Sequence, residues 1–404
     1  MLPDAPWQHG SGMTRLLAAL DAAGGATRYV GGCVRDALIA LPVSDVDLAT
    51  RLEPEEVMTR LKRAGIKAVP TGLAHGTVTA VVAGAPIEVT TLRRDLSTDG
   101  RHATVAFTSD WQEDAARRDF TINALSADPL SRALFDYFGG LADLTAGRVA
   151  FIGDPLRRIA EDHLRILRFF RFHARFGRGE PDAGAMAACT ARANDLMALS
   201  RERIADELLK LLALASPTAA VASMVEHGIL RPVLPEIGPD GVERLGALVA
   251  IEQALGAPPD ALRHLAALLP ADRTLAASVA ARLRLSKKSA QRLIAAADRT
   301  DRPPDDARIL AYAIGAESAR DRLLLAGPDE RRAEQMRSLD AWTRPRLPVT
   351  GGDLIAMGLE AGPAVSAALQ ALERQWASAG FSQDRQAVRQ MARRLVEQRL
   401  RDGR

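Results

Sequence analysis

Cysteine and aromatic residues are scarce in this sequence, and each scarcity removes a class of structure from consideration. Cys33 and Cys189 stand alone, without CxxC or Cys/His ligand spacing, so neither a disulfide framework nor a structural zinc site is expected. Aromatic residues make up 4% of the chain, so a place where several gather is informative. No apolar run approaches the length of a membrane span, and the N-terminus lacks the pattern of a secretory signal. We therefore expect a soluble, cytoplasmic protein with no membrane partner.

The chain also lacks an excess of charge of one sign. Its 53 Lys and Arg residues against 50 Asp and Glu residues give a net charge of +3, which excludes a histone-like polycation but leaves a local basic face open. With 404 residues, of which 47% are hydrophobic, the composition is that of an ordinary globular protein of roughly two to four domains.

Strand-like segments are confined to the first third of the chain. "TVTAVVAG" and "PIEVTTLR" predict two strands around a Gly-Ala-Pro turn, whereas the polar stretch "RRDLSTDGRHATVAFTSDW" has little periodicity and predicts a mobile loop. After about residue 145 the pattern is helical. The fold class expected is α+β, with a mixed-sheet head (1–145), a helical neck (146–215), and a helical body and tail (216–404).

Acidic residues in the head have the spacing of a metal site. In "SDVDLAT", Asp45 and Asp47 would point to one face if the segment is a strand, and Glu88 in "PIEVTTLR" is the best candidate for a third carboxylate. Such a set can hold Mg²⁺ with substrate phosphates. Taken alone, a D-x-D pair is more often a solvated edge or a helix cap.

A glycine pair lies shortly upstream of these acids. In "YVGGCVRDALIA" a strand leads through Gly31 and Gly32 into a helix, whose first backbone N–H groups can cradle phosphate oxygens. A lone Gly-Gly is a weak signal, but it becomes specific when a D-x-D pair follows it.

These segments, in order, carry a family resemblance. "GGCVRD", "DVDLAT", "EVTTLR", "GRHATVAF", "RRDFTINAL" and "EDHLRILRFFRF" resemble the bacterial tRNA nucleotidyltransferase and poly(A) polymerase family, within the polymerase-β-like nucleotidyltransferases. The matching blocks span roughly residues 28 to 210, and "LPVTGGDLIAMGL" resembles the family's tail.

The resemblance implies roles for individual residues. Asp45 and Asp47 would bind two Mg²⁺ ions, with Glu88 as a less secure third acid. Gly32 and Arg35 match positions that contact the triphosphate, and Arg118 of "RRDFTINAL" matches an arginine that contacts the nucleotide. The alternatives are that Arg35 pairs with Asp36 or Asp45, and that the arginine pair forms salt bridges at a helix start.

The segment "EDHLRILRFFRF" combines arginines with phenylalanines. If it is one helix, Asp162 and Arg165 lie on one face, where they can accept from an amino group and donate to a ring nitrogen of cytosine or adenine. Guanine and uracil present the opposite pattern. Arg168 and Arg171 continue the stripe and match further nucleotide-contacting positions, while the phenylalanines are expected in the core. The alternative for Asp162 and Arg165 is a surface ion pair.

The function implied is template-independent addition of CCA to the tRNA 3′ end from CTP and ATP, with no obligate protein partner evident. A poly(A) polymerase or an A-only tRNA enzyme shares the head motifs, and a non-catalytic tRNA-binding protein is the alternative of another class. Transfer of a nucleotide to a protein or antibiotic would leave "EDHLR" unused. A basic stretch is equally well a tRNA contact or a solvated helix face; its members are Arg282, Arg284, Lys287, Lys288 and Arg292.

Overall fold

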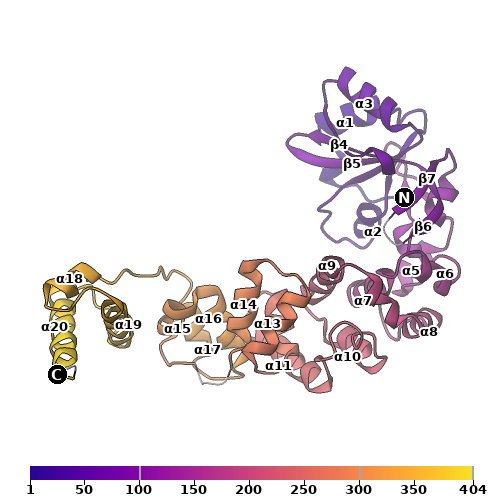
Figure 1. Ribbon diagram of the computed structural model, residues 1–404. Helices are drawn as coiled ribbons and strands as arrows, with labels where there is room; N and C mark the ends of the chain where they lie inside the picture. Colours follow the sequence, from indigo (N-terminus) through magenta and orange to yellow (C-terminus); the bar gives the residue numbers. More distant parts are fainter. Residues whose placement is uncertain (100–101, 300–302, 403–404) are drawn as a thin grey trace. The chain divides into compact units, whose positions relative to one another are not determined.

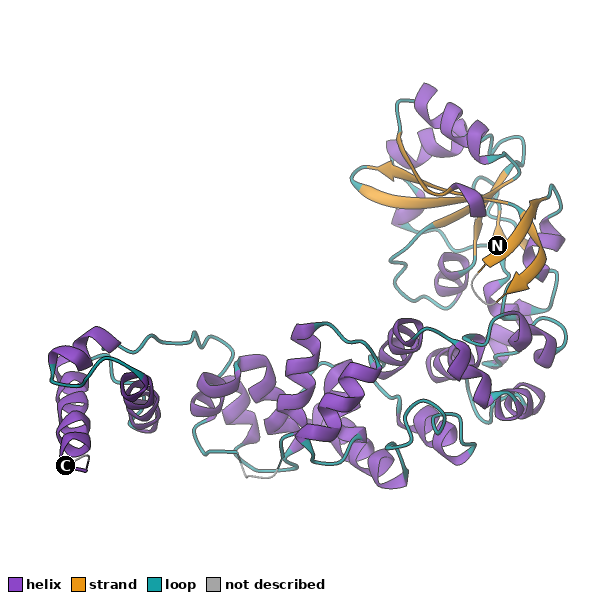
Figure 2. Cartoon of the chain, in the orientation of Figure 1, coloured by secondary structure: helices purple, strands orange, loops and turns teal. Residues whose placement is uncertain are grey.

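A computed structural model of the chain describes residues 1–99, 102–299 and 303–402 (Figures 1 and 2). It divides into two compact units, Met1–Pro239 and Asp240–Arg404. Within the described residues, no helix is long and apolar enough to cross a membrane.

A mixed sheet forms the centre of the first unit. Its strands follow the order β3-β4-β5-β2-β1-β8-β9, in which β2 and β5 are parallel and the other pairs are antiparallel. The strands are β1 (Thr27–Val30), β2 (Asp47–Thr50), β3 (Lys67–Gly72), β4 (Thr77–Val82), β5 (Ala85–Thr91), β8 (Ser126–Ala127) and β9 (Leu134–Phe135). Figure 2 shows the strands gathered in this part of the chain and helices elsewhere, which confirms the predicted α+β class.

Helices cover the sheet and continue beyond it. In the first unit they are α1 (Ser11–Ala19), α2 (Gly32–Leu38), α3 (Pro54–Arg63), α4 (Trp111–Ala116), α5 (Gly140–Ala146), α6 (Pro155–Glu161), α7 (Arg165–Phe176), α8 (Ala183–Ala191), α9 (Arg201–Leu212) and α10 (Thr218–Glu226). Helices α1 and α3 contact β4, and α2 contacts β1 (Figure 1).

The predicted hairpin is present, with its turn shifted by one residue. Strands β4 and β5 pair from Thr77↔Thr90 to Val82↔Ala85. The turn is Ala83-Gly84, both with positive φ (50° and 85°), so Pro86 lies inside the strand instead of the turn. Two successive positive φ values match the right-handed twist of the flanking strands.

The prediction of a loop after β5 is wrong for residues 93–99 and 102–107, and residues 100–101 of the predicted stretch lie outside the described residues. The structure has a second, two-stranded antiparallel sheet there, formed by β6 (Arg93–Asp99) and β7 (His102–Phe107), with Arg93 opposite Phe107. Backbone hydrogen bonds hold such a ribbon together, so its sequence needs no alternation of apolar and polar residues. The polar composition therefore concealed the strands.

The phenylalanines of α7 lie in the core, as predicted. Phe169 and Phe170 are buried, and the Phe169 ring lies 5.9 Å from that of Phe151 and 6.4 Å from that of Phe120. Phe120 precedes the short 3-10 helix Thr121–Asn123, and an isolated backbone bridge joins it to Phe151. This aromatic cluster attaches the start of the helical region to the sheet domain.

The second unit is helical throughout its described residues. A cluster around the fully buried Trp376 forms its C-terminal core, and a second cluster surrounds Leu323. The helices are α11 (Pro239–Leu255), α12 (Ala261–Leu268), α13 (Arg273–Arg282), α14 (Lys287–Ala297), α15 (Ala307–Ile314), α16 (Ala316–Leu325), α17 (Arg332–Arg337), α18 (Gly351–Ala356), α19 (Pro363–Ser378) and α20 (Arg385–Asp402).

Replacing Phe169 tests the aromatic cluster. Phe169→Ala should lower the free energy of unfolding by about 3 to 5 kcal/mol, because it removes a fully buried ring and leaves a cavity. Urea unfolding followed by circular dichroism measures the change. Met197→Ala, which truncates an exposed side chain, is the control and should have little effect. Equal losses in the two variants would contradict the assignment of the core.

Candidate functional site

Two acidic residues lie side by side on the parallel strands of the sheet. Asp47 is the first residue of β2, and its register partner on β5 is Glu88. Register partners on neighbouring strands point to the same face of a sheet, so these two carboxylates share one face. The predicted association of Glu88 with this site therefore has a structural basis.

Asp45 lies outside the strand, and the prediction that it alternates with Asp47 along one strand is wrong. Strand β2 begins only at Asp47, and the exposed Asp45 precedes it, where its Oδ2 accepts a hydrogen bond of 2.8 Å from Ser44 Oγ. The segment before Asp47 has no backbone pairing with β1, whose register with β2 ends at Tyr29↔Leu48. Asp45 is thus a loop residue that precedes the strand position at which Asp47 lies beside Glu88.

The surroundings of Asp47 disfavour the ionised form of its carboxylate. Burial, with the negative charges of Glu88 and Asp45, raises its pKa to about 6 against the opposing positive charge of Arg118. A divalent cation would relieve the same repulsion, and carboxylate oxygens are the donors that Mg²⁺ prefers. Among the described residues, no three His, Cys, Asp or Glu side chains form a metal-holding group. These acids would therefore supply part of a coordination shell, with phosphate and water oxygens completing it.

The glycine pair forms the turn that the sequence predicted. Gly31 lies between β1 and α2 with φ of 68°, and Gly32 is the first residue of α2. The positive φ favours glycine at this position, and a Cβ atom there would stand 3.0 Å from Nη1 of Arg118, so that side chain would have to shift. The turn thus brings Arg118 close to the backbone that leads into α2.

Hydrogen bonds hold the side chain of Arg118 in place beside Gly31. Its Nη2 donates to Oδ2 of the buried Asp114 at 3.2 Å, and Nη1 donates to the carbonyl of Asn123 at 3.4 Å. Arg117 binds the other oxygen of Asp114 at 2.8 Å. The salt bridges considered as the alternative are therefore present. Arg118 also lies near enough to Asp47 to lower its pKa.

Arg35 makes the ion pair that was considered as its alternative role. It is buried, and its Nε donates to Asp36 Oδ1 at 2.7 Å while Nη1 donates to Oδ1 of Asn123. Its guanidinium also lies 4.2 Å from the centre of the Phe176 ring. In this structure Arg35 therefore connects α2 to the 3-10 helix and to α7.

Asp162 and Arg165 do not share a helix, so the predicted geometry is wrong. Helix α6 ends at Glu161, Asp162 has extended backbone (φ −153°, ψ 108°), and α7 begins at Arg165. The two residues instead flank a tight turn, in which the Arg165 N–H donates to the carbonyl of Asp162 at 3.0 Å. The turn keeps the two backbones close, while each side chain binds a different partner.

Each of these two side chains is held by a neighbour that sequence reasoning missed. Oδ2 of Asp162 accepts from Nη2 of Arg203 at 2.7 Å, and Nη1 of Arg165 donates to Oε2 of Glu161 at 2.6 Å. Arg165 also donates to the carbonyls of Arg158 and Arg117. Both partners belong to segments that resemble the family. Glu161 is the first residue of "EDHLR", and Arg203 lies in "SRERIADELLKLL".

Arg168 and Arg171 are bound to buried carboxylates. Nε of Arg168 donates to Oδ2 of Asp119 at 2.7 Å, and Nε of Arg171 donates to Oε1 of Glu207 on α9. Burial raises the pKa of Asp119, but the positive charge of Arg168 and the hydrogen bonds from Asn123 and Phe120 outweigh it and hold that pKa below its ordinary value. The arginine stripe of α7 thus ties three segments of the first unit together.

Comparisons with known proteins match this architecture. A family model described as "Poly A polymerase head domain" matches residues 27–150, and one described as "Probable RNA and SrmB- binding site of polymerase A" matches residues 181–240. The mitochondrial CCA tRNA nucleotidyltransferase 1 of Mus musculus is 34% identical over 89% of this chain and 84% of its own. The CCA-adding enzyme of Limosilactobacillus fermentum is 30% identical over 95% of this chain and 96% of its own.

A solved structure shares the fold. The crystal structure of the Bacillus stearothermophilus CCA-adding enzyme in complex with CTP superposes with a TM-score of 0.73 at 24% identity, covering 98% of this chain and all of that chain. The chain belongs to the CCA tRNA nucleotidyltransferase and poly(A) polymerase family, as its sequence motifs predicted. Nucleotidyltransferases of this superfamily generally use a divalent metal ion.

The raised pKa of Asp47 predicts a pH-dependent stability difference. The ordinary value is 3.8 and the folded value is about 6, so ionised Asp47 destabilises the folded state at neutral pH. Asp47→Asn should therefore raise the free energy of unfolding by about 1 to 3 kcal/mol at pH 7.5. The gain should shrink as the pH falls below about 6 and vanish at about pH 3, where both states carry the proton.

Urea unfolding at both pH values, in the presence of a chelator, measures the gain. Asp206→Asn, which neutralises an exposed carboxylate on α9, is the matched control. A difference for Asp47→Asn that stays constant with pH would contradict the assignment.

Proposed function

We propose that this chain adds C, C and A to the 3′ end of tRNA, by transferring nucleotides from CTP and ATP with release of pyrophosphate. The proposal rests on the pair of acidic residues on β2 and β5, Asp47 and Glu88, beside the Gly31 turn. The chain also matches its relatives in this family over nearly its whole length. The acids supply metal-binding oxygens, and the turn and Arg118 supply positive partners for phosphate.

The head residues divide the work by position. Asp45 and Asp47 would hold Mg²⁺, with Glu88 adjoining them, and the bound metal would activate the RNA 3′-hydroxyl and neutralise charge on the triphosphate. Gly31 and Gly32 leave the backbone open to close approach by phosphate oxygens.

Two arginines complete this arrangement in different ways. Arg118 is the best placed guanidinium to contact the triphosphate, because it lies against the Gly31 turn and influences Asp47. Arg35 acts through Asn123, whose side chain it holds.

Base selection falls to Asp162 and Arg165. An Asp carboxylate accepts from the amino group of cytosine or adenine, and an arginine donates to the adjacent ring nitrogen. Uracil and guanine would instead place a carbonyl oxygen against the carboxylate and a ring N–H against the arginine. Arg165 uses three of its five N–H donors in contacts with described residues, which leaves donors for a base. Glu161 and Arg203 would position the pair, and Arg168 and Arg171 would support it from α7.

Several features of the account stay predictions. They are the division into a head (1–145), a neck (146–215) and a tRNA-binding body and tail (216–404), the choice of Mg²⁺, and the cytoplasmic location.

Product lengths test the function. Purified protein is incubated with Mg²⁺ and with tRNA transcripts that end before CCA, and products are resolved on a sequencing gel. CTP alone should add two residues, CTP with ATP should add three, and UTP or GTP should add little. Asp45→Ala/Asp47→Ala should reduce the rate at least about 100-fold, because it removes the metal-binding oxygens. Asp206→Ala, on the exposed face of α9, is the matched control and should leave the rate unchanged.

Other products would identify other functions. A single A on CC-ended tRNA would indicate an A-only enzyme, and long A-tails would indicate a poly(A) polymerase. Binding of tRNA without any incorporation would contradict the enzymatic proposal.

A further inference from the structure

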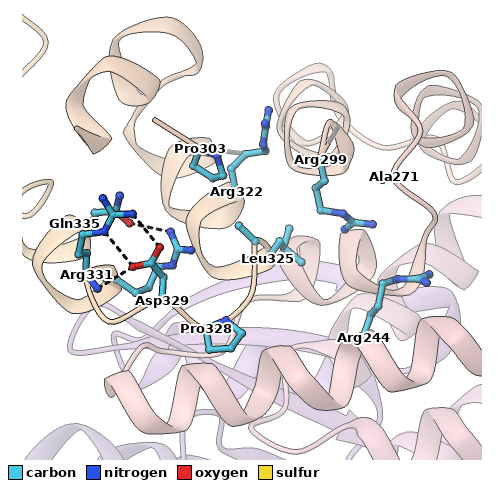
Figure 3. Close-up of a pocket in the computed structure, with 12 residues that line it drawn as sticks. Arg244, Ala271, Arg299, Pro303, Arg322, Leu325, Pro328, Asp329, Arg331 and Gln335 are labelled. Carbon is cyan, nitrogen blue, oxygen red and sulfur yellow. Dashed lines mark hydrogen bonds and ion pairs between the residues drawn. The ribbon is translucent and has the colours of Figure 1, made fainter. Parts of the chain in front are cut away.

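The second unit contains a cavity of about 600 Å³ whose lining is rich in arginine (Figure 3). No sequence motif indicates this cavity, because its lining residues come from helices and loops that are far apart in the chain. The lining contains one acidic residue, Asp329, and the exposed Ala326, which follows α16. Its five arginines are Arg244, Arg299, Arg322, Arg331 and Arg332.

The basic stretch predicted from the sequence is a different set, and one of its members is turned inward. Nε of Arg292 donates to Oδ2 of the fully buried Asp321 at 2.6 Å, and its Nη2 lies 2.9 Å from Oδ2 of Asp260. Arg292 is therefore committed to an internal ion-pair network and is not part of an open basic face.

One side of the cavity is balanced in charge. Arg331 donates to Asp329 Oδ1 through its backbone N–H at 2.9 Å and through Nε at 3.3 Å, and its Nη1 reaches Asp305 at 2.7 Å. Nη1 of Arg332 donates to Oε1 of Gln335 at 2.8 Å. Figure 3 shows this group beside the cavity, with Arg244 and Arg299 on the far side of Leu325.

The other side combines positive charges that are held by neutral acceptors. Arg299 donates to the carbonyls of Ala266 and Leu269, both at 2.6 Å, and Nε of Arg244 donates to the carbonyl of Ala267 at 2.9 Å. These carbonyls belong to the C-terminal end of α12. Within the described residues, no hydrogen bond or ion pair joins Arg244 or Arg299 to a carboxylate.

The charges on this side repel one another. Burial, together with the positive charges of Arg244 and Arg322, lowers the pKa of Arg299 to about 10. Arg322 is buried and lies 3.8 Å from Asp298. An anion placed in the cavity would offset this repulsion, and the carbonyl contacts already fix two of the guanidinium groups, so little ordering is needed on binding.

We propose that this cavity binds a phosphate group. Guanidinium groups bind two phosphate oxygens at once, which suits a cavity with several arginines facing one space. The group could belong to an RNA backbone or to a free phosphate compound, since both present the same oxygens. The proposal does not depend on the function of the head, because binding is measured without nucleotide addition.

Adding a negative charge at the cavity tests the proposal without removing an arginine. Ala326→Glu places a carboxylate at the lining and leaves the contacts that arginines make with α12 intact. Ala313→Glu makes the same change at an exposed position on α15 that does not line the cavity. Thermal unfolding of the full chain checks that both variants fold.

Calorimetry with inorganic tripolyphosphate, in the presence of a chelator, measures binding. The unmodified chain and Ala313→Glu should bind tripolyphosphate alike. Ala326→Glu should bind it at least about tenfold more weakly, because the introduced carboxylate competes with phosphate for the guanidinium groups. Equal binding by both variants, or no binding by the unmodified chain, would overturn the proposal.

A second titration with tRNA distinguishes the two sources of phosphate. A loss of tRNA affinity in Ala326→Glu but not in Ala313→Glu, together with weaker tripolyphosphate binding, would assign the cavity to an RNA backbone phosphate. Unchanged tRNA affinity with weaker tripolyphosphate binding would assign it to a free phosphate compound.

Discussion

The buried carboxylate of Asp119 is the interaction on which the arrangement of the first unit depends. It accepts hydrogen bonds from Nδ2 of Asn123 at 2.9 Å and from the Phe120 backbone at 2.9 Å, and it pairs with Arg168 of α7. Asn123 in turn holds Arg35 of α2. One residue thus connects the helix that follows the glycine turn, the 3-10 helix and the helix that begins at Arg165.

This network explains why so many arginines lie beside so many phenylalanines on α7. The rings fill the core next to Phe120 and Phe151, and the arginines bind carboxylates from Asp119 and α9. A buried ion pair adds little net stability compared with an apolar pair, but breaking it leaves an uncompensated charge. The arginines therefore fix which segments meet, and they hold the turn that carries Asp162 and Arg165 in one place relative to the sheet.

Local sequence was sufficient where a feature depends on neighbouring residues. The strand, Gly-Gly and helix around Gly31, the β4–β5 hairpin and the buried phenylalanines follow from backbone freedom and periodicity. The proximity of Glu88 to Asp47 was expected, and the parallel register of β2 and β5 gives it a basis. The β6–β7 ribbon was missed because backbone pairing leaves no mark in a polar sequence.

Features that depend on long-range partners could not be predicted. The choice of Asn123 as a partner of Arg35, the break between α6 and α7 at Asp162, and the inward turn of Arg292 are decided by packing. Periodicity continues across Asp162, so sequence alone extended the helix through it. The partners Glu161 and Arg203 lie in segments that the motifs included, but spacing gives no information on which side chains meet.

A double-mutant cycle on Asp119 and Arg168 tests the central role of this pair most directly. The efficiency of CTP incorporation is compared for Asp119→Asn, Arg168→Met and the combined variant, with unfolding measured alongside. Each single change should lower the efficiency of CTP incorporation. The fold-loss of the combined variant should be smaller than the product of the two single fold-losses, because the ion pair is already broken once either partner has been replaced. Losses that simply multiply would show that the two side chains act independently and would contradict the account.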